Sequence, residues 1–314
     1  MLAASGGISR EQLNHPFEIG MGTHRLTLQH IHAAERAWLE RCAGNAAASL
    51  PPPDENATIT SIRQAAGETA GKRKKFLSSL SDGDMDRIIH VTRGDQHFEL
   101  KLEDIFLHVC NHAMHHRAQA VNMQRALGVK PPFTEYIFMQ VESRADPAPQ
   151  LSAAMLRDYI AYSDWARDRV IESANGISDE KLDKTFDVGL GSIRKTLAHL
   201  ADVDRWWMEN WSSDASRLFP QPRENAKLEQ IKQDYRKTSD ARNKFVAGLS
   251  DQDLNRAIKA QPEAGRTLDF PLGQTMIEVA NHATHHRSHA INMLRRVGIT
   301  VPPTDYSVIK RRQV

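Results

Sequence analysis

The chain has 314 residues, which is enough for two domains of ordinary size. Hydrophobic residues make up 40% and charged residues 25%, and Gly and Pro are not enriched, so the composition excludes collagen-like and low-complexity proteins. The formal net charge of +2 gives no strong field toward a nucleic-acid backbone or an acidic membrane, so we expect neither partner. The unusual feature is the presence of 15 histidines.

Three features favour a cytoplasmic location. No stretch approaches the roughly 18 apolar residues that a membrane span needs, and Arg10 and Glu11 near the N-terminus are not accompanied by an apolar signal core. Two cysteines, Cys42 and Cys110, in a chain of this length favour a reducing compartment over a disulfide framework. We expect both cysteines to be buried small residues.

The chain contains an internal repeat. Residues 111–117 (Asn-His-Ala-Met-His-His-Arg) recur at 281–287 with six of the seven residues identical, at an offset of 170. A second block, Thr-Leu-Gln-His at 27–30, recurs as Thr-Leu-Ala-His at 196–199, at an offset of 169. We therefore predict two copies of one domain, at residues 1–142 and 151–314, joined by the polar, proline-containing linker 143–150.

In chain order, the first copy begins with a segment in which Ile8 aligns with Ile177 and Phe17 aligns with Phe186. Seven residues precede Ile8, whereas the second copy has a whole predicted helix at that place, so we expect the first copy to lack its first helix. Two explanations are open. Either the stated start of the chain is too late, or a neighbouring domain or subunit, as in a homo-oligomer, covers the exposed apolar groove.

The helices are predicted most clearly in the second copy. Apolar spacing predicts an amphipathic helix over 151–174, and a second helix that is capped by Ser192 and carries His199. A charged helix is predicted over 225–248, and a fourth over 273–297, which ends at Gly298 before two prolines. Four helices in a complete copy predict an all-α fold made of two tandem four-helix bundles.

The histidines gather on two of these helices in each copy. Residues i, i+3 and i+4 of a helix share one face, so the histidines of the repeated motif project together, and one further histidine recurs on a different helix. An i, i+4 pair plus one residue from a facing helix is how a bundle builds an internal metal site, and three neutral imidazoles with an open position suit zinc or another divalent first-row metal. The candidate ligands are His30, His112 and His116 in the first copy and His199, His282 and His286 in the second.

Aligning the two copies also indicates roles for the residues next to the candidate ligands. His115 and His285 recur beside the ligand pair, and we expect them to support the ligands or to face a substrate. His108 aligns with Glu278, one turn before the pair. Two interpretations of this difference are open: the two sites differ in affinity, protonation or substrate preference, or the position is an ordinary one in the core or at the rim.

Two other histidines have no counterpart in the opposite copy. His32 aligns with Ala201, and His289 aligns with Gln119. The comparison therefore predicts surface or packing roles for both histidines.

This arrangement resembles the DinB/YfiT-like family of four-helix-bundle metalloproteins. The resemblance rests on Thr-Leu-Ala-His at 196–199 and on the Asn-His-xxx-His-Arg motif followed by Gly and Pro-Pro, and it covers nearly the whole chain as two tandem copies. It implies that the metal ligands are the two histidine triads named above, with zinc or nickel as common metals. For several members it also implies S-transfer with low-molecular-weight thiols such as bacillithiol or mycothiol.

We therefore interpret the chain as a metal-dependent thiol S-transferase that acts on a small-molecule electrophile and activates a thiol cosubstrate as a metal-bound thiolate. A free thiol has a pKa of about 8.5, and coordination to a dication deprotonates it. Arg117 and Arg287 are candidate anchors for a carboxylate. Two alternatives stay open: a metal-dependent hydrolase with Glu278 or Glu209 as the base, and a non-catalytic metal-binding stress-response protein.

Overall fold

The computed structural model describes residues 1–132, 134, 136, 151–213 and 216–313. The chain divides into two compact units, which are formed by residues 1–132 with 303–314 and by residues 133–302. Helices predominate in both units, as predicted. The predicted linker 143–150 lies outside the described residues. The grouping of residues 303–314 with the first unit is a feature that the repeat did not predict.

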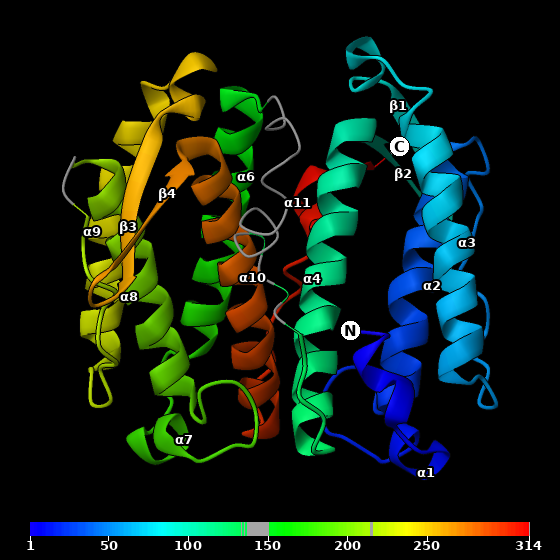
Figure 1. Cartoon of the computed structure of the whole chain (residues 1–314), viewed down its shortest axis with the longest axis horizontal. Helices are drawn as coiled ribbons and strands as arrows, with labels where there is room; N and C mark the ends of the chain where they lie inside the picture. The colour runs from blue at the N-terminus through cyan, green and yellow to red at the C-terminus, as the bar shows by residue number, and fades with distance from the viewer. Residues whose placement is uncertain (133, 135, 137–150, 214–215, 314) are drawn as a thin grey trace. The chain divides into compact units, whose positions relative to one another are not determined.

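The second unit contains a four-helix bundle (Figure 1). Helix α10 packs against α6 and α8, and α9 packs against the same two helices, so the four form a closed ring. The short helix α7 lies between α6 and α8 in the sequence. The bounds are α6 (Ala153–Ser173), α7 (Asp179–Asp183), α8 (Ile193–Trp211), α9 (Leu228–Ala247) and α10 (Leu272–Arg296), close to the predicted ranges. The predicted cap is confirmed, because the Ser192 side chain accepts a hydrogen bond from the backbone N–H of Lys195.

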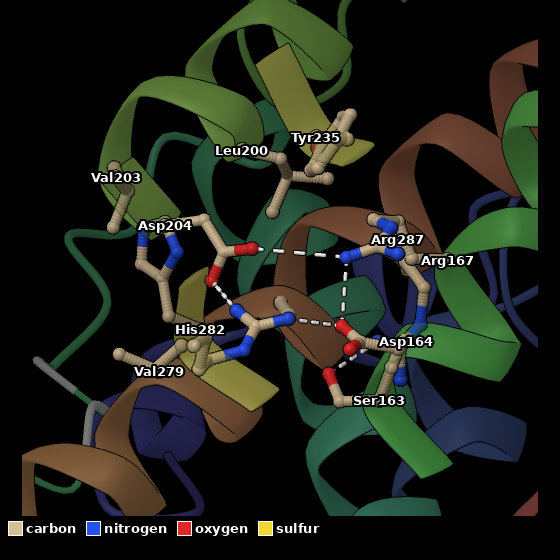
Figure 2. Close-up of a pocket in the computed structure, with 12 residues that line it drawn as sticks. Ser163, Asp164, Arg167, Leu200, Val203, Asp204, Tyr235, Val279, His282 and Arg287 are labelled. Atoms are coloured by element: carbon tan, nitrogen blue, oxygen red, sulfur yellow. Dashed lines mark hydrogen bonds and ion pairs between the residues drawn. The ribbon is translucent and has the colours of Figure 1, made fainter. Parts of the chain in front are cut away.

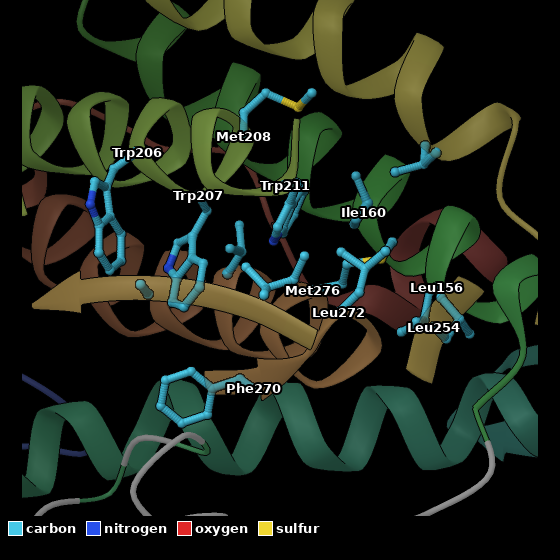
Figure 3. Packing of buried hydrophobic residues seen from close by; sticks show 14 of the residues in the cluster. Leu156, Ile160, Trp206, Trp207, Met208, Trp211, Leu254, Phe270, Leu272 and Met276 are labelled. Carbon is cyan, nitrogen blue, oxygen red and sulfur yellow. The ribbon is translucent and has the colours of Figure 1, made fainter. Parts of the chain in front are cut away.

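Aromatic and aliphatic side chains from the helices of this bundle and its hairpin form one buried cluster (Figure 3). Trp206, Trp207 and Trp211 project from α8, and Phe270 covers them from a hairpin of β3 (Ala257–Glu263) and β4 (Arg266–Pro271). Trp206, Trp207 and Trp211 are all buried. This apolar cluster fixes α8 against α10, the two helices that carry the candidate ligands.

The first unit has three long helices, α2 (His24–Cys42), α3 (Ile59–Leu77) and α4 (Leu102–Ala126). Helix α2 packs against both of the others. Within residues 1–132 only short elements precede α2, namely the 3-10 turn η1 (Ala4–Gly7) and α1 (Arg10–Leu13), so no helix there takes the place of α6. Two further 3-10 turns, η2 (Asp82–Asp84) and η3 (Gln252–Asn255), precede the hairpins of the two units.

Each unit contains an antiparallel hairpin that the sequence analysis did not predict. In the first unit, β1 (Ile88–Arg93) pairs with β2 (Gln96–Lys101), with Val91 opposite Phe98 and Ile89 opposite Leu100. These four side chains alternate with polar ones, so they share the face of the hairpin that is buried in the core with Trp38. The all-α fold class is confirmed, but its prediction did not include these two small hairpins.

The C-terminal segment 303–314 completes part of the first unit. Helix α11 (Tyr306–Lys310) packs against α4, and β5 (Arg312–Gln313) pairs antiparallel with β2 at the edge of the hairpin. The Tyr306 side chain is fully buried, and its hydroxyl donates a hydrogen bond to Asp104 at 3.2 Å. The backbone N–H of Ser307 lies 3.4 Å from His108 Nδ1.

A buried ionic network joins three helices of the second unit (Figure 2). Arg242 of α9 is 2% exposed and binds Asp204 of α8 and Asp164 of α6. Arg167 of α6 binds Asp164 at 2.7 Å and lies 3.8 Å from Asp204. Burial alone would disfavour the charged form of Arg242, but the two carboxylates outweigh it and raise the pKa of this guanidinium.

The repeat places a much more exposed ion pair at the same point of the first unit. Arg73 of α3 binds Glu35 of α2, and these side chains are 48% and 20% exposed. Within residues 1–132 no helix supplies partners as α6 does in the second unit, and the pair is correspondingly more exposed.

The two cysteines differ in burial. Cys42 is buried, as expected, but Cys110 is exposed, so the prediction that both are buried is wrong. Ala280, the repeat counterpart of Cys110, is 1% exposed in a unit where α6 packs along α10. No helix of residues 1–132 covers α4 in that way. Within the part of the chain that the structure describes, no helix combines the length and the apolarity needed to cross a bilayer.

Candidate metal centres

The structure brings the predicted ligands together as two sets of three histidines. Each set combines one histidine on α2 or α8 with an i, i+4 pair of histidines on α4 or α10. Their ligand atoms all lie within 4.8 Å of one another, and each of the six side chains is half-buried. The sets are His30, His112 and His116 in the first unit and His199, His282 and His286 in the second.

Helix capping sets the depth of the single histidine in each set. The Thr23 side chain accepts a hydrogen bond from the N–H of Leu26 and starts α2, as Ser192 starts α8. His30 and His199 each follow their cap by seven residues, which is two helical turns. The ligand from the facing helix therefore stands at the same height in both units.

The spacing of the imidazole nitrogens fits a single bound ion. His30 Nε2 lies 3.2 Å from His112 Nε2, and His199 Nε2 lies 3.2 Å from His282 Nε2. Two nitrogens bound tetrahedrally at 2.0 to 2.1 Å from zinc would be about 3.3 Å apart. The three ring-centroid distances are 5.0, 4.5 and 4.6 Å in the first unit and 5.1, 4.7 and 4.5 Å in the second, so the geometry is repeated closely.

Burial keeps these imidazoles neutral at physiological pH. It lowers the pKa of His116 to about 4, and it lowers the pKa of His30 and His199. The pKa values of His282 and His286 fall well below the usual 6.5, because burial disfavours charge and neighbouring histidines repel a second proton. Neutral imidazoles offer the lone pairs that a cation needs, and three of them leave a position open.

The residues that surround the two triads differ. In the first unit Gln119 Oε1 lies 2.7 Å from His116 Nδ1, and Gln119 Nε2 lies 3.0 Å from His115 Nε2. In the second unit His289 occupies this position, with its ring centroid 4.7 Å from that of His285 and 5.7 Å from that of the ligand His286.

Gln119 and His289 are 6% and 1% exposed, and both lie against a triad. The sequence analysis predicted a surface or packing role for His289. It missed that this position lies beside a ligand histidine, because the two copies carry unlike residues there and the difference was interpreted as the lack of a shared role. The i, i+3 spacing from His116 and His286 was the signal that could have found it.

A glycine turn packs against this same position in each unit. Gly20 and Gly189 adopt positive φ angles of 63° and 59°, a backbone region that favours glycine. A Cβ at Gly20 would lie 3.3 Å from Gln119 Oε1, and one at Gly189 would lie 2.7 Å from His289 Nδ1. The turn before α2 or α8 therefore approaches the residue beside the triad as closely as its backbone allows.

The candidate catalytic residues are placed in different surroundings. Arg287 is 2% exposed and donates hydrogen bonds to Ser163 of α6 and to Thr284. With His282 it lines a cavity of about 20 Å³, which has room for one water molecule (Figure 2). Glu278 is buried one turn before His282 on α10, whereas Glu209 is exposed and lies 3.8 Å from Arg205.

Three other predicted residues of the first unit lie on α4 or α2. Arg117 is half-buried on α4, directly after His116. His108 is buried, with its ring 4.9 Å from that of Trp38, so the buried His108 and Glu278 occupy equivalent places near the two triads. His32 is half-buried on α2 and belongs to neither triad.

Comparison with known proteins gives one family for both halves of the chain. A family model described as "DinB family" matches residues 4–147 and again residues 151–313. The protein named DinB from Bacillus subtilis (strain 168) is 24% identical over 152 residues, which are 47% of this chain and 88% of that protein. No solved structure matches significantly.

Proposed function

Since this chain belongs to the DinB family, we propose that each histidine triad binds a divalent metal ion, zinc or nickel, and that the protein uses it to transfer a low-molecular-weight thiol to a small electrophile. The observation that carries the proposal is the pair of half-buried triads with matching geometry and neutral imidazoles. A bound dication would supply the deprotonation of the thiol and hold it at the open coordination position.

The protein side chains would provide a dry and oriented site. His199, His282 and His286 would present ring-nitrogen lone pairs from two helices that the aromatic core holds in place. Half-burial limits the access of bulk water to the triad and would leave one side open to a small molecule. Arg287, which shares a cavity with His282, would add positive potential that favours an anionic thiol or a substrate carboxylate.

Metal content of the purified protein tests the first part of the proposal. We expect about two ions per chain, and about one after His286→Ala, because this substitution removes a ligand of one triad. His90→Ala is the matched control, since His90 is on β1 and faces Glu99 rather than a triad. Unchanged metal content in His286→Ala would show that the ligands are assigned wrongly.

A thiol-dependent electrophile screen with the metal-loaded protein tests the second part. Turnover that requires added thiol supports S-transfer. Turnover without thiol would indicate hydrolysis by activated water, and no turnover in either condition would indicate a non-catalytic metal-binding protein. Product analysis by mass spectrometry should show the thiol joined to the electrophile.

A further inference from the structure

One ligand of the six has a hydrogen-bond partner on its outer nitrogen. His116 Nδ1 lies 2.7 Å from Gln119 Oε1, and Gln119 is itself held by His115 at 3.0 Å. Within the described residues, the Nδ1 atoms of the other five ligands make no such bond to the protein. In particular, His286 Nδ1 is buried without a hydrogen-bond partner there.

This bond selects a tautomer of His116. In the orientation that the structure gives the Gln119 amide, its oxygen faces His116 and accepts, so His116 carries its proton on Nδ1 and donates it. Nε2 is then unprotonated and faces His30 and His112, where its lone pair can bind a cation. The amide N–H of Gln119 donates to His115 Nε2, so a single amide orientation satisfies both contacts.

The second unit lacks this arrangement. His289 stands where Gln119 stands, and its ring meets that of His286 edge-on, at 90° and a centroid distance of 5.7 Å. Within the described residues, His286 Nδ1 has no hydrogen-bond partner, on His289 or elsewhere. The tautomer of His286 is therefore not fixed by this neighbour. The two triads have nearly the same shape but different support.

We propose that Gln119 is a positioning residue that holds His116 in its metal-binding tautomer and makes the first centre the tighter of the two for a divalent cation. This inference rests on the proposed metal-binding function, and it concerns affinity and not turnover. Loss of a group that orients a metal-bound histidine typically weakens metal binding about 10- to 100-fold.

Single-centre proteins make the comparison direct. His282→Ala leaves the first centre, and His112→Ala leaves the second, each in the full-length chain. Zn²⁺ affinity is then measured by competition with a chromophoric chelator, after circular dichroism has shown that the helices are retained. We expect the first centre to bind Zn²⁺ more tightly than the second.

Substitutions at the supporting position separate orientation from packing. In the first-centre protein, Gln119→Leu keeps the volume but removes the acceptor, and we expect Zn²⁺ affinity to fall about 10- to 100-fold. Gln119→Glu restores an acceptor for His116 Nδ1 and should keep affinity within a few-fold of the parent. In the second-centre protein, His289→Gln supplies the missing acceptor and should tighten binding.

Nitrogen NMR of the His116 ring provides a readout that a packing role would not change. The metal-free parent should show the proton on Nδ1, and Gln119→Leu should show a mixture of tautomers. Equal affinities for Gln119→Leu and its parent, or an unchanged tautomer, would overturn the inference. If the affinities follow the expected order but no thiol transfer is found, the proposed reaction fails while this inference stands. If neither centre binds Zn²⁺, both fail.

Discussion

The buried network around Arg242 offers the sharpest test of the energetics of the fold. Removing the guanidinium with Arg242→Leu leaves Asp204 and Asp164 facing a low-dielectric interior, with only Arg167 to compensate both. Breaking a buried ion pair by removing one partner costs about 3 to 5 kcal/mol, because the remaining charge stays desolvated. Since Arg167 still binds Asp164 at 2.7 Å, we expect the lower end, about 3 kcal/mol.

The repeat supplies a matched control. Arg73→Leu removes the equivalent guanidinium, but Arg73 is 48% exposed and its pair with Glu35 is screened by water. Such a surface pair contributes about 0 to 1 kcal/mol, so Arg73→Leu should change the free energy of unfolding little. The same chemistry at the same repeat position should therefore have very different effects.

Urea unfolding measures both changes. Far-ultraviolet circular dichroism follows the whole chain, and tryptophan emission follows chiefly the second unit, which holds four of the five tryptophans. With a urea dependence of about 2 kcal/mol per molar, a loss of 3 kcal/mol lowers the midpoint of the second unit by about 1.5 M.

Arg242→Leu combined with Asp204→Leu should recover part of this loss, because no carboxylate is then left unpaired. A midpoint shift for Arg242→Leu no larger than that for Arg73→Leu would refute the reasoning.

Three further outcomes are expected. Gly189→Ala should destabilise the protein more than Gly265→Ala in thermal unfolding. Both glycines have a positive φ, but only a Cβ at Gly189 would meet another side chain, at 2.7 Å from His289. Equal effects of the two substitutions would contradict this close approach. Burial lowers the pKa of His24 to about 4, so the unfolded chain binds a proton near pH 6.5 that the folded chain binds only near pH 4, and stability should fall as pH falls through this window. His24→Gln should make that dependence shallower by about 1.4 kcal/mol per pH unit in urea titrations at several pH values, and an unchanged slope would count against it. Tyr306→Ala should lower the free energy of unfolding of the first unit by about 3 to 5 kcal/mol, and Tyr306→Phe should lower it by about 1 kcal/mol, both measured by chemical unfolding. A small loss for Tyr306→Ala would show that α11 does not support α4.

The helices and the metal ligands could be predicted because their signals are local or repeated. Apolar spacing located α6, α9 and α10 within a few residues, and the side chain of Ser192 capped α8 as predicted. The triads could be assigned because each member recurs at an offset of 169 or 170 on the predicted helices. Two copies of one pattern gave the comparison that a single domain would lack.

The parts that were missed depend on contacts between distant segments. The strand pair of Val91 and Phe98 carries an alternating pattern of only a few residues, which is weak beside long helical periodicity. The exposure of Cys110 depends on which helix covers α4, and a comparison of aligned residues does not contain that information. The contact between Gln119 and His116 was missed for a different reason, since Gln119 and His289 are unlike residues that share one place.

The placement of residues 303–314 bears on how the two copies can evolve. This segment follows the second copy in sequence, yet Tyr306 is buried beside α4 and β5 extends the first hairpin. A deletion of the second copy would therefore also remove part of the fold of the first. The second copy therefore cannot be discarded as a redundant duplicate, so even if it lost its own reaction it would be retained for the folding of the first copy.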